Sequence, residues 1–211
     1  MEQVQKIAVI GGTGKAGRYL VEELVKQGFR IRTLLRNPDK LRNDSGLIER
    51  VKGDVTVYDD VYSLLQGCDA LISTVGPSKG QEPLYSQAAF NIIRAMNELN
   101  IKRYIVVTGM ILNIPGDRKG FRARVLTGMM KFVFPAIAGD RQKEYSILSA
   151  STLDWTLVRL PYIDQAGSQG PIRINLNDCP GNRISATDLA SFLINQLFDE
   201  EFIRKAPFIA N

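Results

Sequence analysis

Four glycines stand in the run GGTGKAG near the start of the chain. Gly12, Gly14 and Gly17 fit the pattern G-x-G-x-x-G, and Gly11 offers the alternative pattern G-x-x-G-x-x-G. The run follows an apolar stretch and precedes an amphipathic one, the strand-turn-helix context in which such glycines bind a pyrophosphate. Backbone N–H groups at the helix start then face the phosphates, helped by the helix dipole. The predicted cofactor-binding residues of this loop are Gly11, Gly12, Thr13, Gly14, Lys15 and Gly17.

An arginine follows the expected second strand, where an NAD-selective site usually has Asp or Glu for the ribose 2′-hydroxyl. This residue is Arg36, with Arg32 nearby. A guanidinium binds a 2′-phosphate through two parallel hydrogen bonds, whereas an acid would repel that phosphate. The sequence therefore favours NADP over NAD. A solvent-exposed arginine before the turn at Pro38 is the alternative.

Other loops are expected at the same edge of the sheet, because ligands of doubly wound sheets bind beyond the carboxyl ends of the strands. Asp54 and Val55 are expected to contact the adenine, although Asp54 is equally suited to cap a helix. Thr74, Val75 and Gly76 are expected over the second half of the dinucleotide, where a glycine permits close approach of the backbone. The loops at this edge are 11–15, 36–40, 53–56, 76–82, 108–119 and 160–170.

Three residues are candidates for catalysis. Two more are candidates for a wall beside the carboxamide of the cofactor's nicotinamide. Thr108 ends the fifth expected strand, where its hydroxyl would orient the nicotinamide or the acceptor; a buried threonine bonded to backbone is the alternative. Lys143 and Tyr145 are reserve candidates for contact with the acceptor, with an exposed helical position as the alternative for the lysine. Pro161 and Tyr162 are expected to form the wall, unless the tyrosine belongs to the core.

The elements that must position these residues alternate along the first half of the chain. Apolar runs predict strands at 6–10, 30–35, 48–52, 69–75 and 103–108. Between them, helical patterns predict helices at 15–27, 58–66 and 83–99 and a short turn at 38–42. In the second half we expect a helix at 140–150, strands at 155–159 and 208–209, and a helix from the capping box at Ser185 to about Leu197. The pattern predicts an α/β fold: a Rossmann-type doubly wound parallel sheet, helices on both faces, in the order 3-2-1-4-5.

Composition limits the classes of protein that fit. The 211 residues suit a single domain, 1–211, with a small substrate-side region at about 110–135 and 160–185 and a surface excursion at 167–181. The net charge of +5 suits an anionic cofactor, and its even distribution argues against a nucleic-acid partner. The chain has no histidine, the commonest general acid or base and metal ligand. Cys68 and Cys179 are too far apart for a metal motif.

The remaining composition indicates a cytoplasmic protein without an integral membrane segment. Disulfides are rare in the cytosol, and the chain begins with a strand pattern rather than a signal peptide. No apolar run reaches the roughly 18 residues of a membrane-spanning helix. We expect a monomer or homodimer and a small-molecule partner.

Taken in order, five motifs resemble those of atypical short-chain dehydrogenase/reductases, over nearly the whole chain. They are Gly-Gly-Thr-Gly-x-x-Gly, Leu-x-Arg-Asn-Pro, Gly-Asp-Val, Ser-Thr-Val-Gly and Leu-Asp-Trp-Thr-Leu-Val-Arg. Within that group the chain is most similar to the NAD(P)H-binding branch that includes biliverdin-IXβ/flavin reductase and NmrA-like proteins. The resemblance implies a Rossmann fold, NADP as cofactor, and hydride transfer to a planar flavin-like or quinone-like acceptor.

The chain departs from the wider superfamily at its catalytic positions. The usual Tyr-x-x-x-Lys is absent, since Tyr145 is followed four residues later by Ser149. Flavin and biliverdin reductases have a serine after the threonine of strand 5, where this chain has Gly109. That change disfavours tetrapyrrole reduction more than flavin reduction, which needs mainly proximity and orientation. A non-catalytic NADP-binding sensor of NmrA type is the alternative function.

Residues 118–134 alternate basic and bulky apolar side chains. Such a basic amphipathic stretch lies on a membrane surface or forms an interface in some proteins. A lid or core helix with a solvated basic edge is the interpretation we favour.

Overall fold

The computed structural model describes residues 5–76, 82–165 and 167–211. Residues 77–81 of the predicted loop 76–82, including Pro77 directly after Gly76, therefore lie outside the described residues. The strands are β1 Lys6–Ile10, β2 Arg30–Leu35, β3 Ile48–Lys52, β4 Ala70–Ser73, β5 Arg103–Gly109, β6 Asp154–Leu160, β7 Tyr162–Asp164, β8 Arg173–Asn175, β9 Arg183–Ser185 and β10 Phe208–Ala210. The helices are α1 Gly17–Lys26, the short 3₁₀ helix η1 Pro38–Lys40, α2 Tyr58–Leu65, α3 Tyr85–Glu98, α4 Phe121–Val133, α5 Pro135–Ala150 and α6 Ala186–Asn195.

The main sheet has the order β3-β2-β1-β4-β5-β6-β10-β8. Its strands are parallel except β8, which pairs antiparallel with β10. The predicted order 3-2-1-4-5 is therefore confirmed. The sixth strand lies next to β5, and the last predicted strand extends the same sheet as β10.

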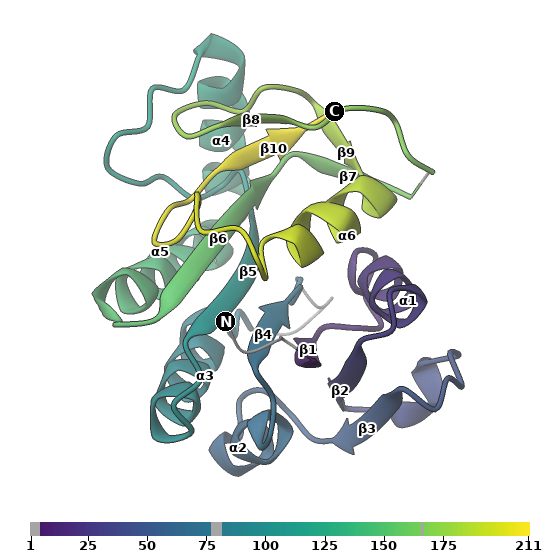
Figure 1. The fold of residues 1–211 in the computed structure, drawn as a ribbon. Coiled ribbons are helices and arrows are strands. Elements are labelled where there is room, and N and C mark those ends of the chain that lie inside the picture. Colours follow the sequence, from purple (N-terminus) through teal and green to yellow (C-terminus); the bar gives the residue numbers. More distant parts are fainter. Residues whose placement is uncertain (1–4, 77–81, 166) are drawn as a thin grey trace.

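Helices cover both faces of this sheet (Figure 1). On one face α1 packs against α6, and both contribute to a core with Ile7, Ile72 and Ile105. On the other face α2, α3 and α5 bury Leu64, Met96 and Leu148 against the sheet. The central strands β1, β4 and β5 are almost fully buried, which is typical of a parallel sheet that is covered on both sides.

The second half is more regular than its sequence pattern indicates. Helix α5 begins at Pro135, five residues before the predicted start, because proline is well suited to the first turn of a helix. Within the predicted surface excursion, Arg173–Asn175 forms the exposed edge strand β8. Strands β7 and β9 form a separate two-stranded parallel sheet. The cap on α6 is confirmed, since the Ser185 hydroxyl accepts a hydrogen bond from the Asp188 N–H at 3.3 Å.

Candidate functional site

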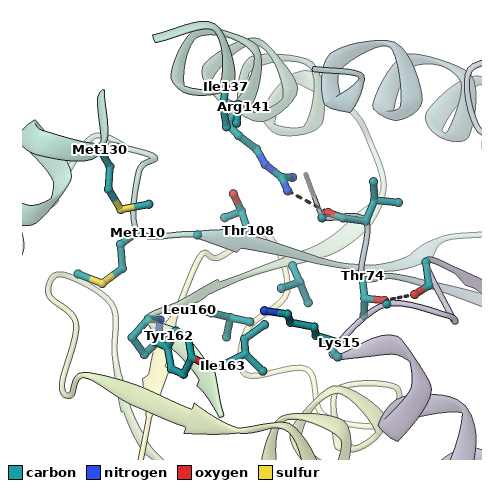
Figure 2. A pocket seen from close by; sticks show the side chains of 18 of the residues that line it. Lys15, Thr74, Thr108, Met110, Met130, Ile137, Arg141, Leu160, Tyr162 and Ile163 are labelled. Carbon is teal, nitrogen blue, oxygen red and sulfur yellow. Dashed lines mark hydrogen bonds between the residues drawn. The ribbon is translucent and has the colours of Figure 1, made fainter. Parts of the chain in front are cut away.

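The glycine loop is closed by a contact between its first and last residues. A Cβ on Gly17 would lie 2.0 Å from the carbonyl oxygen of Gly11, so a side chain does not fit there. Gly11 has φ +84°, a left-handed conformation that favours glycine. The Thr74 hydroxyl donates to the carbonyl oxygens of Ile10 and Gly11, each at 3.3 Å (Figure 2). The end of β4 therefore supports the loop and fixes its shape.

The start of α1 offers a place for an anion. Its N-cap residue is Ala16, which has no side-chain acceptor, and its first turn contains no acidic residue. N–H groups at such a helix start, together with the helix dipole, stabilise a bound negative charge. The Lys15 side chain extends from the loop into the cleft toward Leu160 and Ile163 (Figure 2). The loop, the helix start and the lysine together fit a pyrophosphate.

One cleft of about 2370 Å³ runs across the carboxyl ends of the strands. This volume exceeds the roughly 300–1,000 Å³ that is usual for one small ligand. It is sufficient for a dinucleotide and a second molecule beside it. Of the predicted cofactor-binding residues, those that line the cleft are Gly11, Thr13, Gly14, Lys15, Arg36, Asp54, Val55, Thr74, Val75, Gly76, Thr108, Pro161 and Tyr162. Gly12 and Gly17, also in this glycine run, are buried and do not line the cleft.

Arg36 lies exposed at one end of this cleft, close to Asp54. Burial opposes ionisation of Asp54, but two hydrogen bonds from Thr56, at 2.9 Å and 2.7 Å, and the charge of Arg36 hold the pKa of its carboxyl below the usual value. Arg32 lies away from this end, since it pairs with Glu49 at 2.7 Å and donates to carbonyl oxygens at the end of α2. Of these two arginines, Arg36 is therefore the one that lines the cleft.

Thr108 lies in the middle of the cleft, at the end of β5. Its side chain is buried, and its hydroxyl has no hydrogen-bond partner among the described residues. Figure 2 shows the hydroxyl directed toward Ile137 and Arg141 of α5. The alternative expectation, a Thr108 hydroxyl hydrogen-bonded to the backbone, is therefore not met. A buried hydroxyl without a partner beside open space is suited to a ligand.

Two buried ionisable residues of α5, Arg141 and Glu144, are absent from the sequence-based candidates, and Arg141 lines the cleft with Thr108. Arg141 donates to Glu144 at 2.7 Å and to the carbonyl oxygen of Val75 at 3.0 Å. Its guanidinium also lies over the Tyr85 ring at 3.4 Å. Burial raises the pKa of Glu144, although the charge of Arg141 opposes that shift. Opposite charges three residues apart on a predicted helix were the available signal.

The structure does not bring Lys143 and Tyr145 to the cleft. Lys143 is exposed on the outer side of α5, in a shallow hollow with Ser86 and Gly139. Tyr145 is half-buried and packs edge-on against the Trp155 ring, 6.3 Å between centroids. Neither side chain lines the space around Thr108.

Buried cations hold the wall of the cleft that α4 forms. The Lys119 ammonium donates to the carbonyl oxygens of Met110 and Leu112 at 2.9 Å and 2.7 Å. Burial lowers the pKa of Lys119 to about 8, against the opposing charge of Asp117. Arg159 is fully buried and donates to Asp117 at 2.6 Å. These bonds tie the segment after β5 to β6 and so fix the position of α4.

The fold and the cleft define a Rossmann-type NAD(P)-binding protein. Residues 11–200 match the model of a protein family described as NAD(P)H-binding, and the chain belongs to that family. The match covers both the glycine loop and the α6 helix, so one family model accounts for nearly the whole fold.

The chain is similar to known proteins over nearly its whole length. The uncharacterized protein YwnB of Bacillus subtilis is 24% identical over 200 residues, which cover 91% of this chain and 92% of that protein. The structure of ChuY, an anaerobillin reductase from Escherichia coli O157:H7, has a TM-score of 0.80 at 18% identity and covers 98% of this chain and 97% of its own. A short-chain dehydrogenase/reductase from Veillonella parvula, in complex with NADP, has a TM-score of 0.77 at 16% identity and covers 99% and 95%. At these identities the two structures establish the fold.

Two kinds of feature are absent from the described part of the chain. No helix there is both long and apolar enough to cross a membrane. No group of three or more histidine, cysteine or acidic residues lies within reach of a shared metal ion in those residues.

Proposed function

We propose that this protein is an NADPH-dependent reductase of a planar flavin-like or quinone-like acceptor. The observation that carries the proposal is the single cleft that joins the glycine loop to the open space beside Thr108. A dinucleotide bound along the loop would end near Thr108, leaving the α4 side of the cleft for the second molecule. That side is lined by Met110, Leu126 and Met130, and such flexible apolar side chains adapt to flat ligands.

The residues have distinct proposed roles. The loop and Lys15 hold the pyrophosphate, and Arg36 holds the 2′-phosphate. The Thr108 hydroxyl orients the nicotinamide or the acceptor, and Pro161 with Tyr162 forms the opposite wall. Tyr162 is 68% exposed, so an aromatic face is available there to a ligand. Arg141 is a further candidate for contact with the acceptor, since it lines the cleft from α5. We do not assign a role to Lys143 or Tyr145, which lie outside the cleft.

The proposed reaction needs little acid or base from the protein. When bound, NADPH supplies a hydride, so that a quinone accepts two electrons and one proton from it and a second proton from water to become a hydroquinone, with release of NADP⁺. Holding the two planar molecules together supplies most of the required catalysis. A chain without histidine is compatible with that chemistry.

The direct test is NADPH oxidation with FMN, with a short-chain quinone and with a linear tetrapyrrole. We expect turnover with FMN or the quinone. The tetrapyrrole matters because ChuY is an anaerobillin reductase. Tight NADPH binding without turnover of any acceptor would instead support the sensor of NmrA type.

Arg36→Ala tests the cofactor preference, with Arg32→Ala, four residues earlier in β2, as a control. We expect Arg36→Ala to lower NADPH affinity by about tenfold or more, the usual range for a charge-assisted phosphate contact, while NADH affinity stays unchanged. Arg32→Ala should affect stability but not the ratio of the two affinities. An unchanged ratio in Arg36→Ala would refute the assignment.

A further inference from the structure

Helix α4 lies at one end of the molecule (Figure 1), and several of its apolar side chains are exposed to solvent. Phe121 and Phe132 are 80% and 88% exposed. Residues four, eight and eleven positions apart lie on one side of a helix, so these side chains form a continuous stripe. A contiguous exposed apolar patch marks an interaction site, whereas scattered apolar residues do not. We call this stripe the α4 apolar face; it consists of Phe121, Val125, Met129, Phe132 and Val133.

The opposite side of α4 is firmly packed, so the exposure does not come from a loosely attached helix. Ala123 and Thr127 are buried, and the Thr127 hydroxyl donates to the Met110 carbonyl oxygen at 3.1 Å. Leu126 and Met130 line the cleft. The helix therefore separates the proposed acceptor space from whatever contacts its outer face.

All charged side chains between residues 118 and 139 are basic. Arg118, Arg122 and Arg124 are exposed, Lys131 is partly exposed, and the sequence from 118 to 139 contains no aspartate or glutamate. Two copies of this chain joined symmetrically through α4 would bring these cations together, and like charges in an interface are unfavourable. An anionic lipid surface attracts the same cations and accepts the aromatic side chains.

We propose that α4 docks the protein on an anionic lipid bilayer and presents the cleft to a quinone dissolved in that bilayer. The second part rests on the proposed function, and the first part does not. Phe121 connects the two, because it belongs to the α4 apolar face and also lines the cleft.

The docking is tested by sedimentation with phosphatidylcholine vesicles that contain or lack phosphatidylglycerol. We expect binding only with phosphatidylglycerol, and weaker binding as salt increases. Each basic side chain near such a surface contributes about fivefold in affinity, so Arg118→Gln with Lys131→Gln should weaken binding by roughly 25-fold. Met129→Gln with Phe132→Gln should also abolish most binding. None of these four residues lines the cleft.

A matched control changes the same residue types elsewhere. Phe90 is 59% exposed on α3, and Lys102 is exposed before β5. Phe90→Gln with Lys102→Gln should bind vesicles as the wild type does. Binding that is equally strong without phosphatidylglycerol, equal loss in the control, or no binding at all would overturn the proposal. If the wild type does not bind vesicles but forms a dimer, and Phe132→Gln makes that dimer dissociate, the α4 apolar face binds a second copy of the chain and the lipid proposal is wrong.

An activity assay then separates docking from catalysis. Wild type should reduce both a long-chain quinone held in the anionic vesicles and a short-chain quinone in water. The Met129→Gln/Phe132→Gln variant should lose the first activity and keep the second. If neither quinone is reduced while the vesicles are still bound, the docking stands and the quinone reductase proposal fails. Equal loss of both activities would overturn the presentation of the cleft to the bilayer.

Discussion

Gly17 and Gly11 touch across the phosphate loop: a Cβ on Gly17 would lie 2.0 Å from the Gly11 carbonyl oxygen. The contact involves backbone on both sides, so no side chain can move aside to relieve it. The loop, the end of β4 and the start of α1 are thereby held in one arrangement.

Gly17→Ala should therefore damage the loop. We expect it to lower the free energy of unfolding by roughly 3 kcal/mol, the upper part of the range for overpacking, and to lower NADPH affinity. Thermal unfolding and a binding titration measure the two effects. Gly109→Ala is the control, because no described residue lies within 4 Å of a Cβ at that position. Equal Tm values for the two variants would show that the loop tolerates a side chain at position 17.

Thr108→Val tests the hydroxyl that has no partner among the described residues. Valine keeps the shape, so stability should not fall. We expect kcat with the accepted quinone or flavin to fall by about three- to tenfold, the worth of one hydrogen bond. Thr33→Val is the matched control, since the Thr33 hydroxyl also has no partner in the described part of the chain but does not line the cleft. A Thr108→Val enzyme with unchanged kcat and KM would remove Thr108 from the proposed mechanism.

The buried amine of Lys119 should make the free energy of unfolding depend on pH in the alkaline range. Burial lowers its pKa from 10.5 to about 8, so between these values the unfolded chain binds the proton and the folded chain does not. Stability therefore rises with pH in this window, by at most about 1.4 kcal/mol per pH unit. Chemical denaturation from pH 8 to 10.5 should show this rise relative to Lys119→Met. Parallel curves for the two proteins would show that the amine is not perturbed by burial.

Much of the sheet could be predicted because its strands and helices have strong periodic patterns. The runs at β1, β4 and β5 are buried on both faces, β2 and β3 alternate apolar with charged residues, and the intervening helices have one apolar side, which identifies βαβ units. Strands β7 to β9 have three residues each. A sequence pattern of three residues is too short to distinguish a strand from a loop. Their position depends on pairing with residues distant in sequence.

The same limit applies to the candidate site. Lys143 and Tyr145 lie on a helix whose buried positions are Arg141, Glu144 and Leu148, so neither faces the cleft. Which side of α5 faces the sheet follows from its packing on α3, and the sequence of α5 has no clear apolar stripe to indicate it. Arg141 could be recognised as a cleft residue only once this orientation was known.

In the proposed function, one cleft holds NADPH beside an acceptor. The most direct measurement mixes the NADPH-bound protein with increasing concentrations of oxidised short-chain quinone or FMN, without oxygen, and follows the absorbances of NADPH and of the acceptor in a stopped-flow instrument. We predict that nicotinamide oxidation and acceptor reduction proceed at one rate, in equal amounts, and that the rate saturates with acceptor concentration. If NADPH is not oxidised in the presence of either acceptor, the cleft does not hold NADPH and an acceptor together for hydride transfer.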